Sequence, residues 1–338
     1  MESGQEFILI TKPEVILHLT GAYAEGYLLI GDKNYLFTDP RYFYAVKNSI
    51  KDEKTVALLG GLSEVKELLQ EKSLVGLDFS YESVNLYKEI KKVTEVFDAT
   101  DRINRRIARK NETQLEFVQA SCSICEKAFL ATLPSIRLGM TELELASILE
   151  YNFKALGASG TSFDTIIAFG ENSAVPHHQT SNATLKKDSA ILMDFGCKVS
   201  GYCSDMTRTL FFGSPTEEFL QAYSAVQSAH EKAKQNIKSG MSARFADKFA
   251  RKSLEKKGYG EHFTHSLGHG IGTSIHEYPS LSPKSGDEVI LKNGYVFSIE
   301  PGVYFDGKFG IRIEDTVALI GGVVKSFMTD DLNLKIIG

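Results

Sequence analysis

Over the first hundred positions, short runs typical of β-strands alternate with segments in which apolar residues recur at helical spacing. Helical periodicity marks residues 63–72 and 81–92. Strands that alternate with helices are typical of a small mixed α/β domain. We expect this domain to occupy residues 1–105, with its end in the basic stretch at 102–110. Four short runs rich in β-branched and aromatic residues predict its strands, at residues 26–31, 34–38, 55–59 and 74–79.

The remaining residues, 106–338, pass twice through one order of elements, although we see no residue-level repeat. In the first pass, Asn111 with Gln114 and Thr141 with Glu144 have the spacing of capping boxes, in which each side chain bonds the other residue's backbone N–H. Each pair therefore predicts the start of a helix. The strands expected after these helices lie at residues 162–169, 191–195 and 202–212.

The second pass repeats this order. Ser214 and Pro215 open a helix that continues to about residue 238, and Ser242 opens another that Gly258 ends. Strand-like stretches then follow to the C-terminus. The predicted fold is α/β: a small N-terminal mixed α/β domain, followed by two helix pairs that back one curved, mainly antiparallel sheet.

Length and composition agree with two domains in one compact protein. A single hydrophobic core usually stops growing before about 250 to 300 residues, and this chain has 338. Its content of 43% apolar and 24% charged residues is ordinary for a globular protein. The formal charge of -5 comes without any run of like charges, so neither nucleic acid nor a membrane surface is an expected partner.

The chain shows no pattern of export or membrane insertion. Residues 1–6 lack a basic stretch followed by an apolar core, and no segment reaches about 18 uninterrupted apolar residues. The 4 cysteines are too few for a disulfide framework in a chain of this length. We therefore expect reduced thiols and a cytoplasmic location.

Two aspartates, Asp194 and Asp205, bound the segment with the most suggestive chemistry. Gly196 and Gly201 between them permit a turn that would bring both carboxylates to one point from adjacent strands. Carboxylates held close together raise each other's pKa, so such a pair usually shares a proton or binds a cation. Taken alone, however, the segment favours a solvated surface hairpin with two unrelated acids.

Three of the 8 histidines lie close together, at His265, His269 and His276. Neutral imidazole is a common metal ligand and a general acid or base. Gly268 and Gly270 flank His269 and would let the backbone approach a ligand or metal. A phosphate-binding loop is the rival interpretation, but the segment lacks both the Lys-Ser/Thr ending and the spacing of a dinucleotide fingerprint.

Two glutamates, Glu300 and Glu314, lie in apolar runs that read as strands. Such positions rarely hold a glutamate without a partner. The ordinary explanation is a salt bridge, for which Arg312 is the obvious candidate because it would share a strand face with Glu314. A metal site is compatible with the same pattern. His177, considered alone, is typical of a surface loop.

Together these segments resemble the pita-bread metallopeptidase family of Xaa-Pro aminopeptidases, prolidases and methionine aminopeptidases. The resemblance covers residues 163–179, 194–210, 263–279 and 297–317, in the order of the family. It implies that residues 106–338 are the catalytic domain. It also implies five metal ligands, none of them substituted: Asp194, Asp205, His269, Glu300 and Glu314.

The resemblance implies a centre of two divalent ions bridged by Asp205 and Glu314. Because four of the five ligands are carboxylates, Mn²⁺ is the expected metal, with Co²⁺ and Zn²⁺ as alternatives. Such a centre cleaves a peptide by attack of a metal-activated hydroxide. Glu300 would take a proton from the attacking water and pass it to the leaving nitrogen.

Residues around the ligands receive roles from the same resemblance. His177 and His276 would stabilise the tetrahedral intermediate and the departing amine, because imidazole can donate a hydrogen bond to developing charge. His265 would line the pocket for proline. Arg312 would orient a ligand carboxylate, and Tyr304 would join that network.

The N-terminal domain decides between branches of the family. Residues 19–21, 26–30, 37–39 and 41–42 resemble the first domain of prolidases and Xaa-Pro aminopeptidases, which methionine aminopeptidases generally lack. With His265, this favours an Xaa-Pro aminopeptidase or dipeptidase that acts on peptides with proline at the second position. The resemblance also implies a homodimer.

Two other functions remain open. Relatives of this fold bind proteins without hydrolysing them, but they typically lose metal ligands, whereas this sequence keeps all five. Specificity of the methionine type is the second alternative. A creatinase-like hydrolase would be expected to lack the ligand set.

Overall fold

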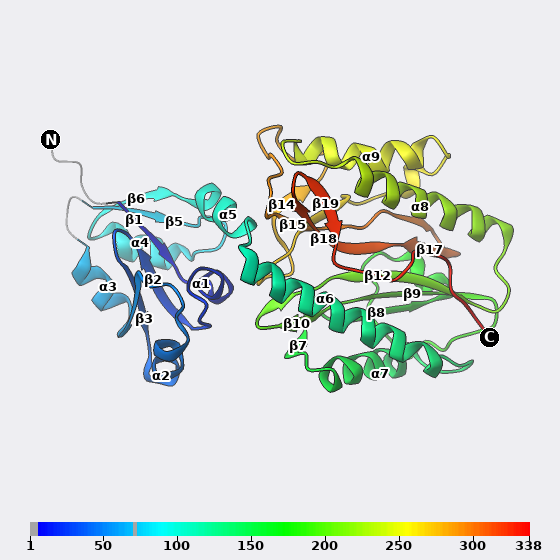
Figure 1. The fold of residues 1–338 in the computed structure, drawn as a ribbon, viewed down its shortest axis with the longest axis horizontal. Helices are drawn as coiled ribbons and strands as arrows, with labels where there is room; N and C mark the ends of the chain where they lie inside the picture. Colours follow the sequence, from blue (N-terminus) through cyan, green and yellow to red (C-terminus); the bar gives the residue numbers. More distant parts are fainter. Residues whose placement is uncertain (1–5, 70–72) are drawn as a thin grey trace. The chain divides into compact units, whose positions relative to one another are not determined.

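A computed structural model describes residues 6–69 and 73–338 of the chain (Figure 1). The chain divides into two compact units, residues 1–107 and 108–338. Among the described residues, the helices are too short or too polar to cross a membrane.

The first unit is a six-stranded mixed sheet in the order β4-β3-β2-β1-β5-β6. Strand β2 pairs antiparallel with both β1 and β3. The pairs β3–β4, β1–β5 and β5–β6 are parallel. The strands are β1 (Glu6–Ile10), β2 (Gly26–Ile30), β3 (Asn34–Thr38), β4 (Thr55–Leu59), β5 (Leu74–Leu77) and β6 (Glu95–Asp98). Its helices are α1 (Pro13–Thr20), α2 (Pro40–Ser49), α3 (Leu62–Leu68), α4 (Val84–Lys91) and α5 (Thr100–Ala108).

The four strands predicted in this unit are present, as are the two helices. The predicted helix at 63–72 ends in α3 at Leu68, and residues 70–72 lie outside the described part of the chain. The pattern missed α2, in which Val46 is the one buried side chain. It also missed α5, where a basic stretch hides the helix that buries Ile103 and Ile107 one turn apart.

The second unit is built on a nine-stranded sheet whose main path runs β14-β13-β15-β18-β12-β9-β8, with antiparallel pairing along it. The path comprises β8 (Ile166–Phe169), β9 (Ser189–Phe195), β12 (Met206–Phe212), β13 (Gly268–Gly270), β14 (Glu277–Leu281), β15 (Val296–Ile299) and β18 (Glu314–Ile320). Beside it, β19 (Val323–Ser326) pairs with β18 and β20 (Ile336–Ile337) with β12. Smaller sheets hold β7 (Gly160–Thr161), β10 (Cys197–Val199) and β11 (Tyr202–Cys203), and the hairpin of β16 (Gly302–Phe305) and β17 (Phe309–Arg312).

Four helices pack in two pairs, α6 (Glu112–Thr132) with α7 (Glu142–Ala155), and α8 (Glu217–Asn236) with α9 (Ala243–Glu255) (Figure 1). Both predicted capping boxes are confirmed: Asn111 with Gln114 begins α6, and Thr141 with Glu144 begins α7. Thr216 and Ser242 cap the second pair. The predicted architecture of the second domain is therefore confirmed.

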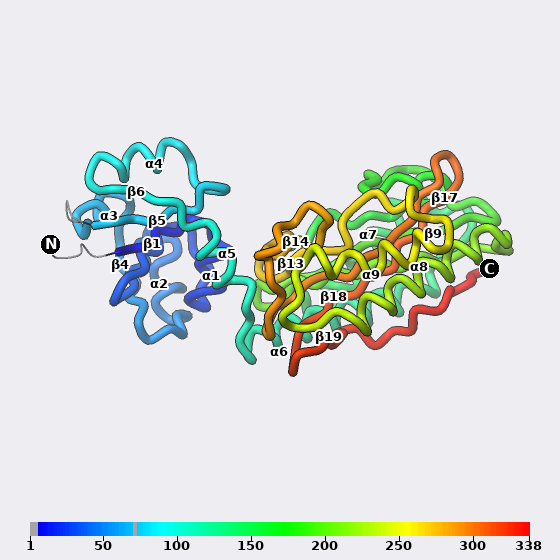
Figure 2. The backbone as a smooth tube through the Cα atoms, turned by 90° about the horizontal axis from the view of Figure 1, so that it is seen from above, coloured from blue at the N-terminus to red at the C-terminus, as the bar shows by residue number. Residues whose placement is uncertain are grey.

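Both helix pairs pack against the same face of the curved sheet. Phe195 of β9 stacks on Phe129 of α6, with ring centroids 5.5 Å apart, and contacts Phe153 of α7 at 6.3 Å. Val317 and Leu319 of β18 belong to the core that contains α8 and α9, which run alongside that strand in Figure 2. Because side chains alternate along a strand, the residues between these point to the other face.

We predict that Phe129→Ala destabilises the second unit by about 3 to 5 kcal/mol, because it removes a fully buried ring and leaves a cavity. Urea unfolding followed by far-UV circular dichroism measures the shift. Leu130→Ala is the matched control, since Leu130 is 45% exposed on the same helix and should change stability by less than about 0.5 kcal/mol. Equal shifts in the two variants would contradict this account of the core.

Candidate metal centre

The five candidate ligands come from five neighbouring strands of the second unit. Asp194 lies in β9, Asp205 directly precedes β12, and Glu314 begins β18. Glu300 directly follows β15, and His269 is the middle residue of β13. Asp194 and Glu314 both pair with Thr207 of β12, so their side chains share the face opposite the helices.

The predicted hairpin between the two aspartates is confirmed, with one correction. Ser200 and Gly201 form its turn, with φ of 50° and 81°, the positive values that two-residue hairpin turns need. The expected strand at 202–212 is broken before β12, which places Asp205 in the break. Gly196 is needed for a different reason, because a Cβ there would lie 2.0 Å from the carbonyl oxygen of Ser204.

The ligand atoms converge on one point. Asp205, His269 and Glu314 each offer an atom within 4.8 Å of the others. His269 Nε2 lies 3.5 Å from Asp205 Oδ2 and 3.4 Å from Glu300 Oε1. Within the described residues, the buried oxygens Asp194 Oδ1 and Glu314 Oε1 have no hydrogen-bond partner. Buried oxygens without a donor are costly, and a cation would satisfy both.

The charges of these residues lead to the same conclusion. Burial, together with the nearby carboxylates, raises the pKa of Asp205 and Glu314 well above the usual range. Burial also raises the pKa of Glu300 to about 7. Carboxylates that are so difficult to ionise are typical of a site for divalent cations. Bound cations would compensate the negative charges while the carboxylates stay buried.

Two hydroxyl side chains that the sequence reasoning did not single out hold the ligands. Thr207 Oγ1 donates to Glu314 Oε2 at 2.6 Å. Ser298 Oγ donates to Glu300 Oε1 at 3.1 Å and accepts from the backbone N–H of His269 at 3.0 Å. Each hydroxyl lies two residues from a ligand, a spacing that puts neighbours on one strand face and could have identified them.

Arg312 bonds a ligand, but not the one expected from strand spacing. Its Nη2 donates to Asp194 Oδ2 at 2.6 Å, whereas the expected salt bridge was with Glu314. A shared strand face for Arg312 and Glu314 would need one continuous strand, but β17 ends at Arg312 and β18 begins at Glu314, with Ile313 between them. Arg312 Nη1 also donates to the hydroxyl of Tyr304 at 2.7 Å, which agrees with the expected network.

His265 adds a histidine to this network, with Nε2 2.9 Å from the hydroxyl of Tyr304. Burial lowers the pKa of His265 to about 3, so its imidazole is neutral near pH 7. Arg251 holds the chain around it by donating to the carbonyl oxygens of Phe263 and His265 at 3.0 and 2.8 Å. The carboxylate of Asp247 in turn pairs with Arg251.

The two remaining histidines lie near the ligands. The rings of His276 and His269 are 4.2 Å apart between centroids, and burial lowers the pKa of His276 to about 4. His177 is exposed, and its charge lowers the pKa of His265 and of His276, which places it within electrostatic range of both. The structure therefore gathers all ten candidate residues in one region.

The glycines beside His269 are required by the packing of the sheet. A Cβ on Gly268 would lie 2.0 Å from the carbonyl oxygen of Ser298, and one on Gly270 would lie 2.3 Å from that of Tyr278. They permit close approach of the neighbouring strands, a reason for glycine that the sequence pattern did not indicate.

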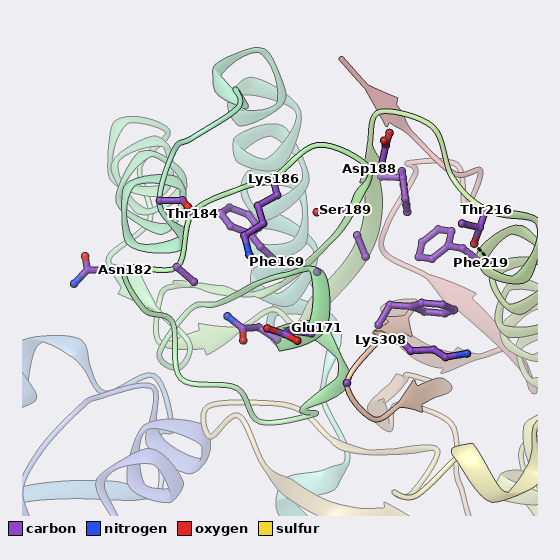
Figure 3. Close-up of a pocket in the computed structure, with 17 residues that line it drawn as sticks. Phe169, Glu171, Asn182, Thr184, Lys186, Asp188, Ser189, Thr216, Phe219 and Lys308 are labelled. Atoms are coloured by element: carbon purple, nitrogen blue, oxygen red, sulfur yellow. Dashed lines mark hydrogen bonds between the residues drawn. The ribbon is translucent and has the colours of Figure 1, made fainter.

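A hollow lies between the 3-10 helix η2 (Gly170–Ala174) and the tip of the β16–β17 hairpin (Figure 3). Its volume is about 640 Å³. Phe169 and Phe219 form apolar parts of its wall, and Lys186, Asp188 and Lys308 give it charges of both signs. Its described lining includes none of the candidate ligands.

A curved antiparallel sheet backed by two helix pairs, with four carboxylates and an imidazole converging on its other face, defines a pita-bread metal-dependent hydrolase. The chain belongs to metallopeptidase family M24, whose sequence pattern matches residues 116–320. The pattern of the creatinase/prolidase N-terminal domain matches residues 1–106. Membership of the family implies divalent metal ions.

Relatives match nearly the whole chain. The Xaa-Pro dipeptidase of Pyrococcus furiosus is 35% identical over 323 residues, which span 94% of this chain and 92% of that protein. Two solved structures have a TM-score of 0.88. The X-Pro aminopeptidase from Thermotoga maritima is 32% identical and covers 98% of both chains. The prolidase from Pyrococcus furiosus is 33% identical and covers 97% of this chain and 96% of that one.

We predict that the metal-free protein loses stability between about pH 5 and 8. The unfolded acids ionise near pH 4, whereas burial raises the pKa of Glu300 to about 7 and the pKa of Asp205 and Glu314 well above the usual range in the folded state. The folded state thus binds more protons in this range, and its free energy of unfolding falls as pH rises. Thermal unfolding at pH 5 and pH 8, with chelator and with Mn²⁺, measures this.

Mn²⁺ should raise the melting temperature more at pH 8 than at pH 5, because it binds the ionised carboxylates. The double variant Glu300→Gln/Glu314→Gln is the control, and its chelated form should depend less on pH. A chelated wild type that is more stable at pH 8 would contradict the prediction.

Proposed function

We propose that this chain is a dinuclear metal-dependent peptidase that removes the N-terminal residue from peptides with proline at the second position. The observation that carries the proposal is a ligand set without substitutions. Asp205, His269 and Glu314 offer atoms within 4.8 Å of one another, and the chain's relatives include an Xaa-Pro dipeptidase and an X-Pro aminopeptidase. The creatinase/prolidase N-terminal pattern supports the proline-directed branch over the methionine type. A non-catalytic binding protein would be expected to have lost ligands.

Two divalent ions would be held by Asp194, Asp205, His269, Glu300 and Glu314. Oxygen-rich sets of this kind suit Mn²⁺, with Co²⁺ or Zn²⁺ as alternatives. When bound, the ions supply Lewis acidity toward the scissile carbonyl and toward water. Asp205 and Glu314 would be the ligands that serve both ions, as the family resemblance implies, and neighbouring carboxylates raise the pKa of both.

Glu300 is the proposed proton carrier. Its carboxylate is held by Ser298 and lies beside His269, so it is fixed at the ligand cluster and not free to rotate away. From this position it would accept a proton from the attacking water and deliver it to the leaving nitrogen. Peptide hydrolysis needs both transfers, because the amine leaves only when protonated.

The histidines would handle the substrate. A low pKa keeps His276 neutral near pH 7, so its imidazole can donate a hydrogen bond to an oxyanion without bringing a fixed charge. His177 would stabilise the intermediate and the leaving amine from the exposed side. His265, held by Tyr304, would line the proline pocket, and Arg312 would fix Asp194 and Tyr304.

The oligomer and the location are further parts of the proposal. The family resemblance supports a homodimer. The four cysteines are all buried and free, which fits a reducing compartment such as the cytoplasm.

We predict that the Mn²⁺-loaded protein hydrolyses Xaa-Pro dipeptides or Xaa-Pro-Xaa tripeptides and leaves Met-Ala-type peptides intact. Release of the N-terminal residue from the three classes, measured in parallel, tests this. The ratio of rates on dipeptides and tripeptides assigns dipeptidase or aminopeptidase activity. Cleavage of the Met-Ala class alone would overturn the proline assignment.

We predict that Glu300→Gln lowers kcat on the preferred peptide by about 10² to 10⁴-fold, because it removes the proton carrier. Metal content is measured on the same samples, since this residue is also a proposed ligand. Glu261→Gln is the control, because Glu261 is an exposed acid. A metal-loaded Glu300→Gln protein with unchanged kcat would exclude this role.

A further inference from the structure

Glu142, the first residue of α7, is a fully buried acid outside the ligand cluster. Its exposed fraction is 0%, a rare state for a glutamate unless several groups satisfy its charge. No feature of the sequence singled it out, because it lies in the first turn of a helix where acids are ordinary.

Five donors surround the Glu142 carboxylate. Oε1 accepts from the backbone N–H of Phe169 at 2.9 Å and from Nδ2 of Asn172 at 2.8 Å. Oε2 accepts from the backbone N–H of Ser181 at 3.0 Å and from its hydroxyl at 2.7 Å. His178 Nε2 lies 2.8 Å from the same oxygen. All of these partners belong to one stretch of chain, residues 169–181.

Backbone bonds tie the end of the same stretch to the start of α7. The N–H of Glu142 donates to the carbonyl oxygen of Ala183 at 3.0 Å, and that of Leu143 donates to Ser181 at 3.1 Å. Thr141 and Thr184 form an isolated antiparallel bridge. The backbone at Glu142 is therefore bonded to the same segment whose donors surround its carboxylate.

His177 lies inside this segment, directly before His178. It belongs to an irregular, exposed stretch without a ladder of backbone bonds of its own. On the other side, Arg312 Nη1 contacts the carbonyl oxygen of Pro176 at 3.3 Å. The residues before and after His177 are therefore held from two sides, by Arg312 of the metal centre and by Glu142.

The carboxylate is suited to this task by its charge. Burial alone would raise the pKa of Glu142, but hydrogen bonds from Asn172, His178 and Phe169 outweigh burial and lower it. The group is ionised near pH 7 and accepts at both oxygens. A glutamine of the same shape would turn an amide NH₂ toward the backbone N–H of either Phe169 or Ser181, which leaves at least that donor without its acceptor.

We infer that Glu142 is a positioning residue for His177: it fixes residues 169–181 so that the imidazole of His177 stays at the substrate side of the metal centre. This inference rests on the catalytic role proposed for His177. Glu142 does not touch substrate or metal, and its effect on the reaction passes through His177. If Glu142 served stability alone, its replacement would lower the amount of folded protein and leave the activity of the folded enzyme unchanged.

The test compares Glu142→Gln with Glu144→Gln. Glu144 lies on the same helix and bonds the N–H of Thr141 at 2.6 Å, so its loss disturbs the same helix start without removing a bond to the segment. For Glu142→Gln we expect kcat on the fastest Xaa-Pro peptide to fall by about 10 to 100-fold with KM nearly unchanged, since a displacement of about 1 Å can cost about 10²-fold. Bound metal should stay at the wild-type level.

A double-mutant cycle with His177→Asn isolates the route of the effect. If Glu142 acts through His177, Glu142→Gln should cost little further activity once His177 is replaced. Additive losses in the double variant would overturn the inference. So would a loss of the same size in Glu144→Gln.

Amide hydrogen exchange gives a readout that needs no activity. Exchange in peptides from residues 169–181 should rise in Glu142→Gln and stay at the wild-type rate in Glu144→Gln. Unchanged exchange in Glu142→Gln overturns the inference, and so does faster exchange with undiminished kcat. If wild type fails to cleave Xaa-Pro peptides, the proposed function fails, and exchange still decides whether Glu142 holds the segment. Ser181→Ala, which removes one donor, should give a smaller effect of the same sign if Glu142→Gln does not fold.

Discussion

Mutual repulsion among buried carboxylates is the constraint on which the second unit depends. The charges of Asp194, Glu300 and Glu314 all raise the pKa of Asp205, and Arg312 ion-pairs with Asp194. Such a cluster is stable in its ionised form only with cations bound. The sheet therefore brings five strands together at the site, and the helices pack on the opposite face, where they keep the ligand strands fixed without filling the space that ions need.

Around this centre, buried acids on the helices hold the loops that carry histidines. Glu142 of α7 accepts from the segment around His177. Asp247 of α9 accepts from the backbone N–H of Leu267 at 3.1 Å and pairs with Arg251, which bonds the carbonyl oxygen of His265. The second helix of each pair thus fixes one histidine loop. Loops are mobile without such anchors, and catalysis requires imidazoles within tenths of an ångström of their place.

Much of the fold could be predicted from local chemistry. Asn111 and Thr141 mark helix starts because their side chains bond backbone groups three residues away, an interaction contained within the local sequence. Elements that are recognisable only from what they pack against were missed. One example is helix α2, which buries only Val46. The hydroxyls of Thr207 and Ser298 were also missed, because a small polar residue in a strand is distinguished only by its spacing of two residues from a ligand.

The sequence by itself determined the helix starts, the hairpin turn and, through the joint spacing of its motifs, the family and the five candidate ligands. These depend on contacts within a few residues or on a pattern of residue types. The tertiary structure decided which partners meet. Arg312 bonds Asp194, 118 positions away, and Glu142 bonds Ser181, because strand register and helix packing place them together. Local spacing carries no information about such contacts, since many distant residues of suitable charge are present and only the folded chain selects among them.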